Sequence, residues 1–156
     1  MSTEARDVRW HVPFGPIILQ STLSKQTWEI LLVRATQLRE GTHPNKDINT
    51  KTNDYRKKLA GCLSEEYSYA GAFNKNEMNI VEEELTWLAS IYTDCAKKAG
   101  KIKSEGVRKP KELIMQKPVW VNFMKSGEWN PSHNHTGKLS CVTYLQVPPE
   151  IEDENT

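Results

Sequence analysis

The stretch WVNFMKSGEWNPSHNHTGKLSCVTYLQVP, residues 120–148, sets the interpretation of this chain. Its first part continues an alternation in which Val119, Val121 and Phe123 lie on one face and Trp120, Asn122 and Met124 on the other, and this period of two predicts a β-strand. Residues 139–147, LSCVTYLQV, predict a second strand by the same pattern. The stretch between them holds two of the chain's four histidines, His133 and His135. In a strand these imidazoles project to the same face, where two of them can bind one metal ion.

Upstream of this stretch the hydrophobic period changes to that of helices. From Lys25 to Arg39 the apolar residues follow a three-four spacing, with Ser24 in place as an N-cap and Gly41 as the stop. The segment Trp10–Gln20 is predicted to be an extended segment interrupted by Pro13, Gly15 and Pro16, either an edge strand or a bulged strand.

A second helix is predicted from Asn76 or Asn79, either of which could cap it, to Lys98, with Gly100 just beyond its end. Acidic residues near its start and lysines at its end complement the helix dipole. The run Glu82–Glu84 is interpreted as a solvated first turn and not as a pair of catalytic carboxylates.

Composition excludes several classes of protein. The chain has 156 residues, 37% of them hydrophobic and 26% charged, with a formal net charge of +1, so nothing in the whole-chain charge favours nucleic acid or an anionic membrane. No apolar run reaches the ~18 residues of a membrane span. The three cysteines, Cys62, Cys95 and Cys141, are sparse and odd in number, which favours thiols in a reducing, cytoplasmic compartment over a disulfide framework.

The C-terminal pattern resembles the 2-oxoglutarate- and Fe(II)-dependent dioxygenases, and most closely a subgroup of phage and marine bacterial sequences. The shared elements are a W-x-N-x-x-x-x-G block, an HxH pair and an L-S-x-V-x-Y-L-x-V-P strand. They fall on Trp120, Asn122, Gly127, His133, His135, Leu139, Ser140, Val142, Tyr144, Leu145 and Pro148. The N-x-Y-x-x-G-x5-H-x-D motif of the nucleic-acid demethylase branch has the same spacing.

This resemblance implies a role for each matching residue. His133 and His135 would be ligands of Fe(II), Asn122 would bind the co-substrate 2-oxoglutarate, and Ser140 and Tyr144 would line its pocket. Two positions depart from the usual pattern. Met124 stands where the demethylase branch has tyrosine, and His135 stands where the superfamily usually has aspartate, so the site is either a three-histidine centre or one in which His135 supports His133 without binding iron.

The same resemblance implies the fold. We expect an α+β protein in which residues 1–111 form a helical buttress and residues 112–156 begin a double-stranded β-helix, or jelly roll, as one domain over residues 1–156. In the family a distal histidine ligand and then an arginine follow the pair, whereas here Lys138 is the only basic residue after His135. We therefore expect the sequence to be a fragment that lacks the distal strands.

Three functions remain open at this level. The leading expectation is a hydroxylase-type dioxygenase acting on an unidentified small molecule or peptide, with no membrane partner and with a homodimer left open. The alternative is a non-catalytic β-sandwich protein, such as a phage structural or accessory module. Demethylation of nucleic acid is the weakest of the three, because the basic stretch 101–111 contains no aromatic residue to stack on bases.

Overall fold

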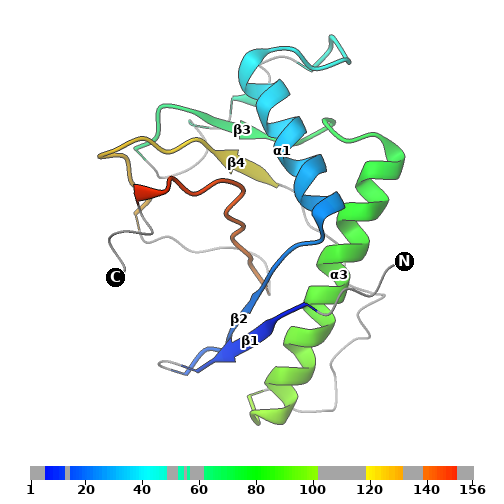
Figure 1. Ribbon diagram of the computed structural model, residues 1–156, viewed down its shortest axis with the longest axis vertical. Coiled ribbons are helices and arrows are strands. Elements are labelled where there is room, and N and C mark those ends of the chain that lie inside the picture. The colour runs from blue at the N-terminus through cyan, green and yellow to red at the C-terminus, as the bar shows by residue number, and fades with distance from the viewer. Residues whose placement is uncertain are drawn as a thin grey trace. The chain divides into compact units, whose positions relative to one another are not determined.

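A computed structural model describes residues 6–12, 15–48, 53–54, 56, 62–101, 119–131 and 139–150. Within these residues the chain is α+β, with two long helices and two antiparallel two-stranded sheets (Figure 1). In chain order the elements are β1 (Val8–His11), β2 (Ile18–Ser21), α1 (Lys25–Glu40), β3 (Glu66–Ser68), α3 (Lys75–Lys98) and β4 (Trp120–Asn122). The chain divides into two compact units, one of Met1–Thr27 with Lys75–Met115 and the other of Trp28–Asn74 with Gln116–Thr156.

The first unit begins with a β-hairpin. β1 and β2 pair antiparallel from Val8 opposite Ser21 to His11 opposite Ile18. Gly15 in the connection has a φ of 111°, a conformation that side chains with a Cβ rarely adopt. The prediction of a single edge or bulged strand over Trp10–Gln20 was therefore wrong, because Gly15 lies in the connection between two paired strands.

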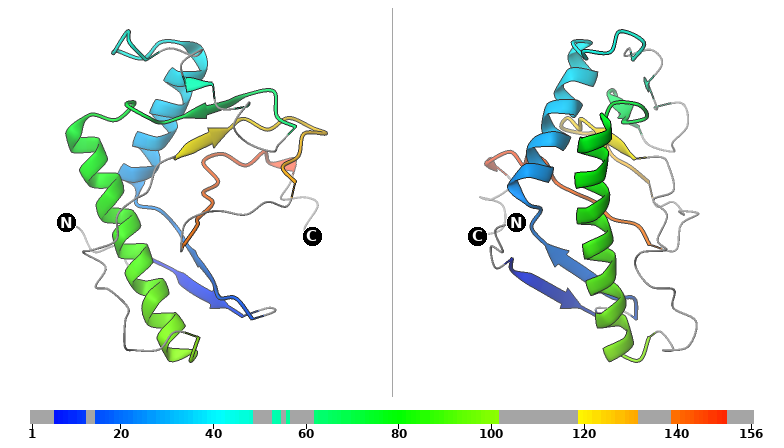
Figure 2. Two further views of the ribbon diagram at one scale, coloured as in Figure 1. Left: turned by 180° about the vertical axis from the view of Figure 1, so that it is seen from behind. Right: turned by 90° about the vertical axis from the view of Figure 1, so that its right-hand side faces the viewer.

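Helix α3 is the longest element of the first unit and runs without a break (Figure 2). Its C-terminal end was predicted correctly. Gly100, with a φ of 66°, lets Lys101 donate its backbone N–H to Ala96 O at 2.9 Å, which closes a Schellman motif. The N-terminal end of α3 was predicted wrongly. The helix begins at Lys75, so Asn76 and Asn79 lie inside it and neither is the N-cap.

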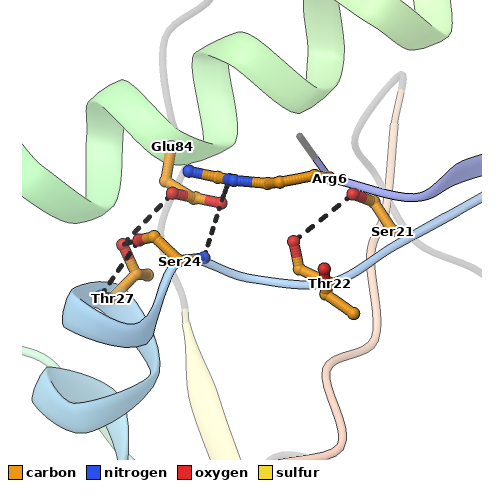
Figure 3. Close-up of polar contacts among 6 residues, drawn as sticks. All are labelled: Arg6, Ser21, Thr22, Ser24, Thr27 and Glu84. Carbon is orange, nitrogen blue, oxygen red and sulfur yellow. Dashed lines mark hydrogen bonds and ion pairs between the residues drawn. The ribbon is translucent and has the colours of Figure 1, made fainter. Parts of the chain in front are cut away.

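A carboxylate from α3 is buried in the first unit. Glu84 is 7% exposed and accepts hydrogen bonds from the backbone N–H of Ser24 at 3.2 Å and the hydroxyl of Thr27 at 3.4 Å (Figure 3). It also forms an ion pair with Arg6, whose guanidinium lies 4.7 Å from the ring centroid of Trp87. The interpretation of Glu84 as part of a solvated turn was wrong, because its oxygens satisfy donors that would otherwise be free at the start of α1.

The ends of α1 follow the sequence prediction. Ser24 Oγ accepts from the Thr27 backbone N–H at 3.2 Å, which is the N-cap interaction expected of this serine. At the other end Gly41 has a φ of 69°, and Thr42 donates its N–H to Gln37 O at 3.0 Å. The buried side chains of the helix are Thr27, Leu31, Ala35 and Leu38.

In the second unit, α1 packs on the connection between β3 and α3. The hydroxyl of Tyr69, 4% exposed, donates to Leu31 O at 2.9 Å, and its ring stacks on Phe73 at a centroid distance of 5.1 Å. Burial raises the pKa of the Tyr69 phenol. His43 contributes a further link, since its Nδ1 accepts from the Asn45 N–H at 3.1 Å and its Nε2 lies 2.9 Å from Ala72 O.

The strand predicted over residues 139–147 is absent. This part of the chain is irregular, and no backbone–backbone hydrogen bond joins it to another residue that the structure describes. Alternation gives a segment the right faces for a sheet, but a strand forms only when a neighbour supplies the other half of its hydrogen-bond ladder.

Candidate functional site

The residues that the dioxygenase resemblance assigns to co-substrate binding begin on β4, which pairs antiparallel with β3. Glu66 lies opposite Asn122, Tyr67 opposite Val121 and Ser68 opposite Trp120. Two further hydrogen bonds extend the ladder at 2.9 and 3.0 Å, from Tyr69 N–H to Val119 O and from Phe123 N–H to Glu65 O. The strand predicted over 119–124 is thus confirmed in its middle, with a regular core of three residues.

Asn122 is the one candidate ligand residue that this small sheet holds. Its side chain is half-buried, and its Oδ1 is buried with no hydrogen-bond partner among the residues the structure describes. A buried amide oxygen without a partner costs about 1–3 kcal/mol.

The face of β3 that Asn122 shares is unusually polar for a buried strand. Glu66 and Ser68 are 1% and 6% exposed. Directly opposed residues of an antiparallel pair point to the same face, so the Glu66 carboxylate stands beside the Asn122 amide. Asn53, itself 4% exposed, fixes the end of the strand by donating from Nδ2 to Ser68 O at 2.8 Å and to Ala70 O at 3.1 Å.

The opposite face carries an aromatic and charged cluster. The Arg39 guanidinium pairs with Glu65 at 2.6 Å and lies 4.6 Å from the ring centroid of Phe123. Phe123 also meets the ring of Tyr67 edge-on, with centroids 6.0 Å apart. Burial, and after it the charge of Glu65, raises the pKa of Tyr67. These contacts orient α1 against the sheet and leave the Asn122 face free of them.

After β4 the chain makes a tight turn that is fixed at both ends. Gly127, a residue of the motif, has a φ of 81°, so the motif glycine is explained by backbone conformation. Glu128 accepts from the backbone N–H groups of Ser64 and Lys125, each at 2.9 Å. Hydrogen bonds from Ser64 and then Lys125 lower the pKa of Glu128. The Cys62 N–H donates to Trp129 O at 2.9 Å and closes the turn onto the segment before β3.

Of the remaining predicted site residues, the structure describes only Ser140 and Tyr144. His133 and His135 lie outside the residues that the structure describes. Ser140 and Tyr144 are both exposed, Tyr144 by 79%. Among the described residues no hydrogen bond joins Asn122 to either of them, and no group of three His, Cys, Asp or Glu side chains is placed to hold a metal ion.

Sequence reasoning missed two buried carboxylates, Glu66 and Glu84. Glu84 offered no signal, because it lies in a run of three glutamates that is typical of a solvent-exposed helix face. Glu66 offered a weak one, because it alternates with Tyr67 in a strand pattern and so shares a face with Ser68.

Comparison with protein-family models, with curated proteins and with solved structures gave no match. No helix among the described residues is long and apolar enough to span a membrane.

Proposed function

We propose that this chain carries part of the active site of an Fe(II)- and 2-oxoglutarate-dependent dioxygenase that hydroxylates a small molecule or peptide. The observation that carries the proposal is the state of Asn122. The motif requires this residue on a strand, and β4 holds it with a buried Oδ1 that has no partner among the described residues. On this proposal β4 belongs to the start of a double-stranded β-helix that residues 112–156 begin, and residues 1–111 form its helical buttress.

Asn122 carries a group that could contact the implied co-substrate. An amide can turn by 180° about its last side-chain bond, which exchanges Oδ1 and Nδ2 at little cost. Asn122 would then donate a hydrogen bond from Nδ2 to a carboxylate of 2-oxoglutarate, while His133 and His135 would hold the iron. Iron, with 2-oxoglutarate and dioxygen as co-substrates, would supply the oxidising chemistry: one oxygen atom of dioxygen would enter succinate as carbon dioxide leaves, and the other would enter the hydroxylated substrate. The contribution of Asn122 is to bind and orient, because a fixed amide positions an anion without changing its charge.

Glu66 would lie beside a ligand held by Asn122, because its carboxyl group is 1% exposed and stands opposite Asn122 on the same face of the sheet.

The alternative, a non-catalytic β-sandwich module, is favoured by one observation. Tyr144 is 79% exposed and Ser140 is also exposed, whereas residues that line a co-substrate pocket are expected to be covered. In that case His133 and His135 would hold a structural metal ion or cap a loop.

Anaerobic titration with Fe(II) and 2-oxoglutarate tests the proposal. We expect the weak visible charge-transfer band of an iron–2-oxoglutarate complex, and its loss in His133→Ala, His135→Ala protein. His11→Ala is the matched control, because His11 is an exposed histidine in the first unit. Absence of the band in the unaltered chain, with no succinate formed, rejects the enzyme. Iron binding that survives the double substitution points to the structural module instead.

A further inference from the structure

The loop after α1, residues 42–48, contacts the turn that follows β3 near both of its ends. At the first contact, His43 Nε2 lies 2.9 Å from the carbonyl oxygen of Ala72. At the second, Ile48 Cδ1 would lie 3.4 Å from a Cβ placed on Gly71, so the isoleucine packs against the glycine backbone. The loop is therefore held to the turn by one apolar side chain and by one that can gain a proton.

The hydrogen bonds of His43 define its protonation state. A carbonyl oxygen can only accept, so the bond to Ala72 O places a proton on Nε2. The backbone N–H of Asn45 can only donate, and its nitrogen lies 3.1 Å from Nδ1, so Nδ1 carries no proton. The ring is thus a neutral imidazole with its hydrogen on Nε2. A protonated ring could keep the first of these bonds but not the second.

A second partner for Nδ1 lies close by. The carbonyl oxygen of Asn45 is 3.4 Å from this atom, slightly farther than the nitrogen of the same residue. A proton on Nδ1 would face the Asn45 N–H as a like donor, and it could bond only to that oxygen. Asn45 O already accepts from the Ile48 N–H at 3.1 Å, a bond within the loop itself. Protonation would therefore replace a bond that holds the loop by one that competes for its internal turn.

Histidine is the one side chain here whose ordinary titration falls between about pH 5 and pH 8. The other ionisable side chains of the loop, of the turn and of the last turn of α1 are Arg39, Glu40, Lys46, Asp47 and Tyr69. Arg39 is paired with Glu65, and burial raises the pKa of Tyr69 away from this range. A change of the loop between these pH values is therefore assigned to His43.

We propose that the loop of residues 42–48 is a pH-sensitive element, which neutral His43 holds through the Asn45 N–H and protonated His43 releases. The ring stays on Ala72 O in both forms, because an imidazolium also donates from Nε2 and a charged donor makes the stronger bond. The turn after β3 therefore keeps its place while the loop loosens. The proposal does not depend on the dioxygenase function.

Amide exchange of the full chain, followed residue by residue by NMR at about pH 8 and about pH 5, tests the proposal. After correction for intrinsic rates, protection of the Asn45 amide is expected to fall at least about tenfold at the lower pH, which corresponds to the loss of one hydrogen bond. The Ala72 amide, which donates to Tyr69 O at 2.9 Å within the turn, is the internal control and should keep its protection. Equal protection of Asn45 at the two pH values, or a parallel loss at Ala72, overturns the proposal.

His43→Asn removes the titration and keeps the acceptor. An asparagine oxygen readily accepts from the N–H two residues along the chain, as Nδ1 of His43 does here. We expect the Asn45 amide of this variant to be equally protected at both pH values. His11→Gln is the matched control, because His11 is exposed and belongs to the first unit, and it should leave the response of the loop unchanged. A pH response that persists in His43→Asn, or that is lost in His11→Gln, assigns the change to another group and overturns the proposal.

Discussion

The indole N–H of Trp28, near the start of α1, donates to the carbonyl oxygen of Leu145 at 2.8 Å across 117 residues of sequence. It is the one side-chain hydrogen bond that holds residues 139–147 to the rest of the second unit among the residues that the structure describes. Through this contact α1 sets the direction of a segment that has no ladder of its own.

Trp28→Phe should therefore lower the free energy of unfolding by about 1 kcal/mol, the usual contribution of one hydrogen bond. Urea denaturation of the purified protein measures it. Trp129→Phe is the control, because Trp129 is 57% exposed and makes its contact through the backbone, so a change below about 0.5 kcal/mol is expected there. Equal effects of the two substitutions would mean that the ring and not the N–H of Trp28 matters.

Glu84→Ala should be the most damaging single change in the first unit. It leaves the Ser24 N–H and the Thr27 hydroxyl without their acceptor, and Arg6 without its counter-charge, for a loss of about 2–4 kcal/mol. Glu83→Ala, on the exposed side of the same turn, is expected to change the unfolding free energy by less than about 0.5 kcal/mol. Comparable losses would contradict the buried role of Glu84.

From the raised pKa of Tyr69 we expect the protein to lose stability at alkaline pH. Its folded-state pKa is raised by burial, so the stability that this group contributes is complete below its unfolded pKa of about 10 and is lost as the pH rises above it. In Tyr69→Phe the alkaline part of the stability curve should be flatter, and stability at neutral pH should fall by about 1 kcal/mol with loss of the bond to Leu31 O. Unfolding midpoints between pH 7 and 11 measure both effects, and an unchanged alkaline slope would contradict the assignment.

From the lowered pKa of Glu128 we expect the protein to lose stability at acid pH. Hydrogen bonds from Ser64 and Lys125 lower its folded pKa, so its contribution is present above its unfolded pKa of about 4.3 and is lost as the pH falls through the folded value. Glu128→Gln should make stability less dependent on pH below about 4.5, whereas Glu83→Gln should not. Urea unfolding midpoints of both variants over the acid range measure this difference, and equal pH dependence of the two would contradict the role of Glu128.

Asn122 separates function from stability. Replacing an amide that carries an unsatisfied buried oxygen by leucine of similar shape should leave the unfolding free energy unchanged or raise it. If the dioxygenase proposal holds, Asn122→Leu should nevertheless weaken 2-oxoglutarate binding at least tenfold, as measured by calorimetry with Fe(II) present. A clear loss of stability would show instead that Asn122 has a structural task.

The helices could be predicted from sequence because their signals are local. Gly41 and Gly100 mark helix ends by a backbone conformation that they adopt at low cost, and Ser24 caps α1 with its own side chain. The burial of Glu84 could not be predicted, because it depends on donors 57 to 78 residues away.

The sheet and the site were predictable only in part, for a related reason. Trp120–Asn122 form a strand because Glu66–Ser68 pairs with them, and residues 139–147 have the same alternation without such a neighbour among the residues that the structure describes. Of the site, the sequence indicated Asn122 and its strand, whereas the buried carboxylate opposite it belongs to a segment with no recognisable motif.

The position of Glu84 also bears on how the chain is made. A growing polypeptide emerges from its N-terminus, and the start of α1 emerges long before the carboxylate that completes its cap. Until residue 84 has been synthesised, Arg6, Ser24 and Thr27 lack the group that joins them in the finished protein. We therefore expect the first unit to become resistant to protease only late in synthesis, after α3 has left the ribosome.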